Sequence, residues 1–137
     1  MIKIQNLSSK TFSKFGLVLE QADKKKVFSV LTGDKTAKGW RIGYLIFHPA
    51  PVDSLERHPG SMETFEPVSG TTVILVAEQG NPDKIEAFLL DKPVCVAKNV
   101  WHGVRVLSEK AEIKITENYD VESVIHKLKK PIDAVFV

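Results

Sequence analysis

The chain has 137 residues, of which 43% are hydrophobic, and this is enough to bury the core of one globular domain spanning residues 1–137. Nineteen Lys and Arg residues against 17 Asp and Glu residues leave a net charge of +2, which argues against a nucleic-acid-binding protein. The sequence has neither an apolar run as long as a membrane span nor a signal peptide at its start, so we expect a cytoplasmic protein without membrane partners.

The single cysteine, Cys95, lies in an apolar run that extends from Val94 to Ala97. One cysteine cannot form a disulfide within the chain, and its apolar neighbours favour a buried thiol. A free buried thiol is compatible with an intracellular protein.

Residues 7–16 have the pattern of a short helix near the start of the chain. Ser8 is a suitable N-cap, Leu7 and Phe12 have the spacing of a hydrophobic staple, and Gly16 is a suitable end. We therefore expect a short N-terminal helix.

Most of the remaining chain has the composition of short β-strands, rich in β-branched and aromatic residues. The expected strands are residues 17–19, 27–31, 40–47, 56–58, 62–66, 72–77, 85–90, 94–97, 100–107 and 111–116. Gly, Pro, Asn and Asp separate most of them. About ten short strands at this spacing predict a mainly β sandwich or barrel that closes its own edges.

The end of the chain has the pattern of a second helix. Apolar residues recur at helical spacing between Asp120 and Pro131, at Val121, Val124, Ile125 and Leu128. This pattern predicts a C-terminal helix that packs its apolar stripe on the outside of the barrel.

The stretch 56–65 combines carboxylates, an imidazole and a tight turn within ten residues. If residues 59–62 form the loop of a hairpin, His58 lies opposite Glu63 with their Cβ atoms about 4.5–5.5 Å apart, and Glu56 shares the face of His58. Carboxylates on a buried face need a cation, a protonated partner or a polar substrate. The alternative is an exposed hairpin whose charges are solvated.

The stretch 98–106 is the second candidate part of a site. As a strand it places Lys98 and His102 on one face of the sheet and Trp101 on the other. A lone His in an apolar row is often a core histidine, and Trp101 is more simply an aromatic wall residue than a substrate contact. However, barrels build ligand sites from inward-facing side chains of facing strands. Two His and a carboxylate also form a common ligand set for Zn, Mn, Fe or Ni.

The spacing of these residues resembles the cupin motifs. Glu56-x-His58 is followed by Glu63 after four residues and by Gly70 after six more, although Glu56 stands where cupins usually have a first His. Of the second cupin motif only His102 is present, with Asn99 at the position of a turn glycine.

Three blocks more specifically resemble the ureidoglycolate lyase branch of the cupins. They are Leu7-Ser8 with Phe12 and Phe15-Gly16, then residues 56–67 (Glu-Arg-His-Pro-Gly-Ser-Met-Glu-Thr-Phe-Glu-Pro), and Asn99-Val100-Trp101-His102. The sequence departs from that family at Glu63, where the lyases tend to have Gln, and at Gly103, where a polar residue commonly follows Trp-His. The Glu favours a metal, whereas we expect the Gly to remove a substrate contact.

The resemblance implies a cupin-type double-stranded β-helix, or jelly-roll barrel, with a short N-terminal and a C-terminal helix. It also implies a homodimer and a carbon–nitrogen lyase that acts on a small carboxylate or ureido metabolite, either with the assistance of a divalent metal or through acid–base residues alone. His58, Glu63, His102 and Glu56 are the expected metal ligands, with His58 or His102 as an alternative base and Glu63 as an alternative acid. Lys98 and Arg57 are the expected cations for a substrate carboxylate. The alternatives are a non-catalytic small-molecule or sugar-binding cupin and a cupin isomerase with another substrate.

Overall fold

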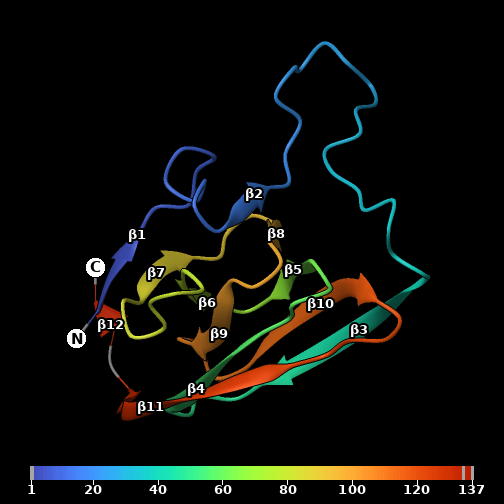
Figure 1. Ribbon diagram of the computed structural model, residues 1–137. Coiled ribbons are helices and arrows are strands. Elements are labelled where there is room, and N and C mark those ends of the chain that lie inside the picture. The colour runs from blue at the N-terminus through green and yellow to red at the C-terminus, as the bar shows by residue number, and fades with distance from the viewer. Residues whose placement is uncertain (1, 134, 137) are drawn as a thin grey trace.

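The computed structural model describes residues 2–133 and 135–136, and within these residues it consists of strands joined by loops and turns, with no helix (Figure 1). The strands are β1 (Ile2–Gln5), β2 (Gly16–Val18), β3 (Trp40–Phe47), β4 (Val52–Arg57), β5 (Glu63–Ser69), β6 (Thr72–Ala77), β7 (Glu86–Leu89), β8 (Val94–Val96), β9 (Trp101–Val106), β10 (Ala111–Asn118), β11 (Val124–Ile132) and β12 (Val135–Phe136). The described residues accordingly contain no helix that could span a membrane. The prediction of a mainly β fold is confirmed.

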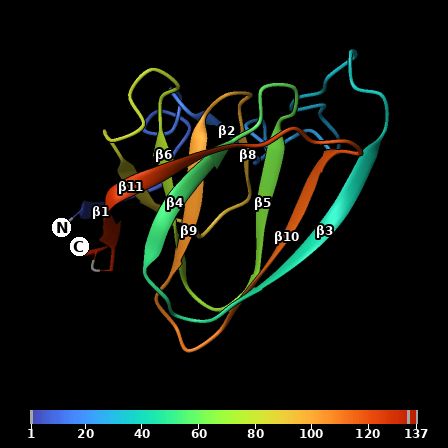
Figure 2. The same ribbon diagram turned by 60° about the horizontal axis from the view of Figure 1, so that its bottom comes forward.

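The strands form two curled sheets that lie on opposite sides of the interior (Figure 2). One has the order β11-β4-β9-β6-β7-β1-β12, and the other has the order β2-β8-β5-β10-β3. Between them lies an apolar core to which both sheets contribute, with Phe88 of β7 and Ile113 of β10 fully buried. The site described below opens from this same interior.

The larger sheet is buried on both faces at its centre. Every residue of β6 is buried, and Ile74 and Val76 pack into the core between the sheets. Val73 and Leu75 point the other way, into a second apolar cluster that includes Trp101 and Leu128. A strand buried on both faces has a continuous apolar sequence rather than an alternating one, as β6 does.

The predicted N-terminal helix is not formed. Ser8 caps a single turn, because its side chain accepts a hydrogen bond from the N–H of Thr11 and its carbonyl accepts one from the N–H of Phe12. The following residues form successive turns that place Phe12 and Phe15 against Phe88 in the core. So short a segment gains few backbone hydrogen bonds from helix formation, and the aromatic contacts decide its shape.

The predicted C-terminal helix is wrong, because residues 124–132 form strand β11, which pairs antiparallel with β4. Val124 and Leu128 are four residues apart, a spacing that fits one face of a strand as well as one face of a helix. Burial alternates along the first part of the strand, with Ile125 exposed and Leu128 buried. The free edge of β4 takes this partner, and Pro131 lies where the pairing register shifts.

Residues 27–31 do not form the predicted strand. They belong to a long segment, residues 19–39, that extends away from the two sheets (Figure 1). Val27 is fully exposed and Phe28 is 78% exposed, so the β-forming composition of this stretch has no partner strand within the described chain. The sequence also did not predict β1, which pairs in parallel with β7 and β12. Cys95 is buried as predicted, and burial raises the pKa of its thiol to about 11.

Gly70 joins β5 to β6 in a conformation that only glycine adopts easily, with φ at +79°. A methyl group there would also meet the carbonyl of Lys110 and the backbone of Ala111. We therefore expect Gly70→Ala to lower the free energy of unfolding by about 1–3 kcal/mol. Gly80→Ala is the matched control, because an added methyl meets no atom within 4 Å, and its effect should stay within about 0.5 kcal/mol. Urea denaturation followed by tryptophan fluorescence measures both, and equal effects would contradict the assignment.

Candidate metal and active site

The predicted hairpin between residues 56 and 66 is not formed, yet its His and Glu still meet. β4 pairs with β9 and β11, whereas β5 pairs with β8 and β10, so the two strands belong to different sheets. Residues 58–62 cross from one sheet to the other. His58 and Glu63 therefore face each other across the interior instead of along one ladder.

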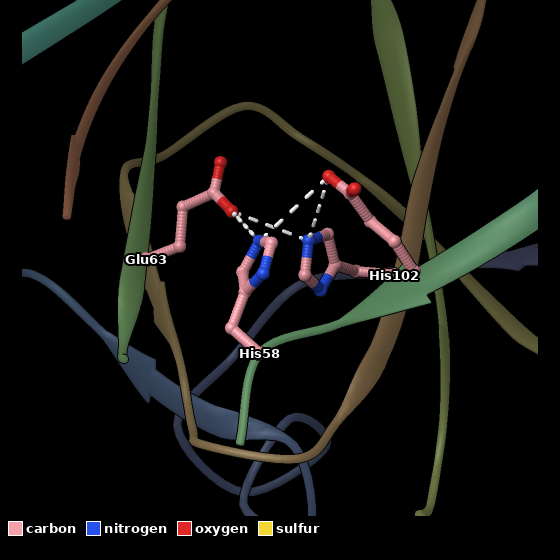
Figure 3. Close-up of side chains that lie close together, drawn as sticks. His58, Glu63 and His102 are labelled. Carbon is pink, nitrogen blue, oxygen red and sulfur yellow. Dashed lines mark hydrogen bonds and ion pairs between the residues drawn. The ribbon is translucent and has the colours of Figure 1, made fainter. Parts of the chain in front are cut away.

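Four side chains converge at this crossing (Figure 3). Nε2 of His58 lies 2.8 Å from Oε1 of Glu63, and Nε2 of His102 lies 3.2 Å from the same oxygen. Oε1 of Glu56 lies 3.7 Å from each of the two Nε2 atoms. Glu56 is directly opposite His102 in the pairing of β4 with β9, which puts both side chains on the same face. The structure thus brings together the four residues named from the sequence.

The cluster lies at the inner end of a pocket of about 480 Å³. His58, Glu63 and His102 are each about 4% exposed, whereas the side chain of Glu56 is 41% exposed at the pocket side. Apolar side chains, including Phe47 of β3, line much of the rest. A pocket of this volume accepts a small metabolite.

The other ring nitrogen of each imidazole, Nδ1, has a hydrogen-bond partner in the backbone. Nδ1 of His102 lies 3.0 Å from the carbonyl of Val100, and Nδ1 of His58 lies 3.1 Å from the carbonyl of Glu122. Because a carbonyl only accepts hydrogen bonds, each Nδ1 carries a proton when it bonds its carbonyl, and the hydroxyl of Ser123 also lies 3.1 Å from Nδ1 of His58. Each Nε2 therefore either holds a second proton or offers a lone pair to a cation.

The charges in the cluster shift its pKa values strongly. Burial alone lowers the pKa of His102, but the carboxylates of Glu56 and Glu63 outweigh burial and raise it to about 9. Burial raises the pKa of Glu63, but the two imidazoles outweigh burial and lower it to about 2. In the same way Glu63 overcomes the burial of His58 and raises its pKa. Without a metal, protons on the imidazoles balance the ionised carboxylates.

The donor set fits a divalent cation. One ligand atom from each of His58, Glu63, His102 and Glu56 lies within 4.8 Å of the others. Nε2 of His102 is buried, and its 3.2 Å contact with Oε1 of Glu63 is an ion-pair contact without the geometry of a hydrogen bond, so this nitrogen has no hydrogen-bond partner among the described residues. Two imidazole nitrogens and two carboxylate oxygens suit Zn, Mn, Fe and Ni alike.

Lys98 does not join the cluster. Its Nζ lies 2.8 Å from Oδ2 of Asp34, in the segment between β2 and β3. Asn99 adopts the left-handed conformation that the sequence suggested, with φ at +68°, and β9 begins only at Trp101. Lys98 therefore does not continue the face of His102.

Arg57 and Trp101 lie together on the outer face of the larger sheet. The guanidinium of Arg57 lies over the indole ring at 5.2 Å and donates a hydrogen bond to Oδ1 of Asn99. Trp101 belongs to the outer apolar cluster and donates its N–H to the carbonyl of Gln79. The interpretation of Trp101 as a wall residue is supported, and Arg57 points away from His58.

Gly103 lines the pocket through its backbone, but the structure argues against a missing side-chain contact with the substrate there, contrary to the expectation from the sequence. A side chain at this position would meet Leu55 and Val52, which belong to the outer cluster or pack against it. Residue 103 follows His102 in a strand, so its side chain would point to the opposite face of the sheet.

Sequence reasoning missed two charged residues that line the pocket, Arg41 of β3 and Glu117 of β10. Strand alternation could have indicated that both side chains point inward. Arg41 shares its strand face with Leu45 and Phe47, and Glu117 continues the buried row of Ile113 and Ile115. Their mutual contact joins positions 76 residues apart, which no local pattern reveals.

Two curled sheets with a His and Glu cluster between them are features of a cupin. Procruciferin, an 11S globulin from Brassica napus, superposes with a TM-score of 0.50 at 10% identity, over 65% of this chain and 22% of that chain, and this likeness concerns the fold alone. The ureidoglycolate lyase family matches residues 45–127. Ureidoglycolate lyases from Rhizobium leguminosarum bv. trifolii (strain WSM2304) and Agrobacterium fabrum (strain C58) are 29% and 28% identical to the chain, each over 74% of both sequences. The chain belongs to the ureidoglycolate lyase family of the cupin superfamily.

Metal uptake by this cluster should release protons. At neutral pH His102 carries a proton on Nε2 that a metal must displace, because its pKa is about 9. We expect Zn²⁺ or Mn²⁺ affinity to rise up to about pH 9, by roughly tenfold per pH unit for each proton released. Calorimetric titration of EDTA-treated protein, in buffers with different ionisation enthalpies, counts the protons.

Two variants separate this site from adventitious binding. His102→Gln should weaken metal binding and lower the proton count, whereas His48→Ala, which removes an exposed histidine, should change neither. Affinity that is independent of pH, or that survives loss of His102, would contradict the assignment.

Proposed function

We propose that the chain is a carbon–nitrogen lyase that splits ureidoglycolate into glyoxylate and urea. Membership of the ureidoglycolate lyase family supports this substrate. The observation that carries the proposal is the convergence of the two imidazole Nε2 atoms on Glu63 within a pocket of about 480 Å³.

The reaction breaks the bond between the carbinol carbon and the ureido nitrogen. The hydroxyl group loses its proton as its oxygen forms the new carbonyl, and the electron pair of the broken bond goes to the nitrogen. That nitrogen takes up a proton and leaves as urea. A site for this reaction needs a proton acceptor, a proton donor and a cationic group for the substrate carboxylate.

We assign His58, Glu63, His102 and Glu56 as the ligands of a divalent metal. When bound, such an ion would polarise the substrate hydroxyl or carboxylate oxygen. The hydrogen bonds from Nδ1 to the carbonyls of Glu122 and Val100 fix the direction of each ring and keep both Nε2 atoms aimed at Glu63.

We assign proton transfer in the proposed reaction to Glu56 and, without a metal, to His102. Glu56 is half exposed there, and its pKa is lowered, mainly by His102, so it is ionised and able to accept the hydroxyl proton. The pKa of about 2 argues against Glu63 as the acid and favours its role as a ligand. In the metal-free cluster, the protonated Nε2 of His102 is the proton donor available to the leaving nitrogen.

We expect His58→Ala and His102→Ala each to lower kcat/KM for ureidoglycolate by about 100-fold or more, because each removes a ligand or a proton carrier. A coupled assay for glyoxylate measures the rate. His48→Ala serves as the matched control, since His48 is exposed outside the pocket, and it should retain full activity. Unchanged activity in both site variants would remove the two histidines from the mechanism.

We also propose that the chain forms a homodimer through β3. This strand is at an edge of the smaller sheet, and its outer face carries a row of apolar side chains that are each more than half exposed: Trp40, Ile42, Tyr44 and Ile46. The preceding segment, residues 19–39, adds Val27 and Phe28, which are also exposed. A second copy would cover both surfaces reciprocally about one twofold axis, and a free strand edge favours such pairing.

Sedimentation equilibrium tests the proposed dimer. The wild type should have twice the monomer mass at micromolar concentration, and Ile42→Glu should shift it to the monomer. Leu107→Glu, which changes an exposed apolar residue that follows β9 in the other sheet, should leave the dimer intact. A monomeric wild type, or an unaffected Ile42→Glu dimer, would rule out this interface.

A further inference from the structure

The pocket is rich in acid groups and contains one permanent cation. Its described lining includes the carboxylates of Glu56, Glu63 and Glu117, whereas Arg41 is the sole Lys or Arg among those residues. Arg41 lies on the inner face of β3, and its side chain is 49% exposed. An anionic substrate that enters this pocket therefore meets Arg41 as its one fixed positive side chain.

Glu117 holds Arg41 in place from the neighbouring strand. The two residues are direct partners in the pairing of β10 with β3. Nε of Arg41 donates a hydrogen bond of 2.9 Å to Oε2 of Glu117, and Nη2 lies 2.8 Å from the same oxygen. The carboxylate of Glu117 is only 7% exposed, so its position is well defined.

This arrangement leaves part of the guanidinium available to a ligand. Arginine has five N–H donors in a rigid fork, and Glu117 engages those on one side. Glu117 is contacted by Nε and Nη2 of Arg41, and among the described residues Nη1 contacts no side chain that accepts a hydrogen bond. The other oxygen of Glu117 lies 4.0 Å from Nε2 of His58, so the same carboxylate links the guanidinium to the metal cluster.

We infer that Arg41 binds the carboxylate of the substrate and that Glu117 positions Arg41 for this contact. The inference rests on the proposed function and names the group that recognises the substrate anion. Lys98 and Arg57, the cations expected from the sequence, are engaged by Asp34 and by Asn99 and Trp101. A guanidinium with free donors matches a carboxylate in charge and in geometry.

A purely structural role for Arg41 is the competing explanation. Arg41→Gln alone would leave Glu117 buried without its cation, and the fold itself could suffer. The double variant Arg41→Gln with Glu117→Gln removes both charges and keeps side chains of similar size. If Arg41 only neutralises Glu117, the double variant should behave like the wild type. If Arg41 binds the substrate, the double variant should still bind the substrate weakly.

The test combines turnover of ureidoglycolate with calorimetric binding of glyoxylate, and circular dichroism verifies the fold of each variant. We expect Arg41→Gln and the double variant to raise the KM for ureidoglycolate and the Kd for glyoxylate at least tenfold, with kcat within about threefold. Glu117→Gln alone should raise KM less, and it should add nothing in the Arg41→Gln background. Arg41→Lys should keep part of the affinity, because it retains the charge without the fork.

The outcomes distinguish this inference from the proposed function. Wild-type turnover with a double variant of normal KM and Kd overturns the role of Arg41 and leaves the lyase assignment standing. A wild type that binds glyoxylate through Arg41 without splitting ureidoglycolate overturns the lyase assignment alone. A wild type that neither binds glyoxylate nor turns over ureidoglycolate overturns both.

Discussion

The structure depends on the balance of charge around one carboxylate oxygen. Oε1 of Glu63 is approached by Nε2 of both His58 and His102 in an interior from which water is largely excluded. Burial of an ionised carboxylate without a counter-charge is costly, and the same holds for an imidazolium. Protons on the imidazoles or one divalent cation satisfy this requirement equally, and the Nδ1 contacts keep both Nε2 atoms directed toward the carboxylates of Glu63 and Glu56. The chemistry of the pocket depends on whether protons or a divalent cation lie between the imidazole Nε2 atoms and Oε1 of Glu63.

Closure of the two sheets creates the site, since neither sheet contains it alone. His102 and Glu56 come from paired strands of the larger sheet, and Glu63 comes from the smaller sheet. The ring of Phe65 contacts the ring of His102 edge-on, with centroids 5.4 Å apart, so the apolar core continues directly into the cluster. Loss of packing between the sheets would therefore separate the ligands, and the stability of the core and the geometry of the site are linked.

The sequence predicted the residues of the cluster but not the way in which they meet. The types and spacing of His58, Glu63 and His102 are enough to suggest a shared cavity, and strand alternation correctly separates Trp101 from His102. A local pattern cannot tell a hairpin from a crossing between sheets, because both use a short turn. Val124 and Leu128, four residues apart, likewise fit one face of a helix as well as one face of a strand. Residues 124–132 form a strand because they pair with the edge of β4.

Arg57 and Lys98, the two cations that the sequence suggested for the substrate carboxylate, do not face the pocket. Arg57 adjoins His58 in the chain, yet alternation turns it outward onto Trp101, while Lys98 pairs with Asp34. The cation of the pocket comes instead from β3, which carries none of the four clustered residues, and within the described part of the chain Glu117 links Arg41 to the cluster. Recognition of the anion and the proposed chemistry are thus assigned to different strands, and the buried carboxylate of Glu117 couples them. Because its two oxygens face the two centres, a change of charge at either centre acts electrostatically on the other.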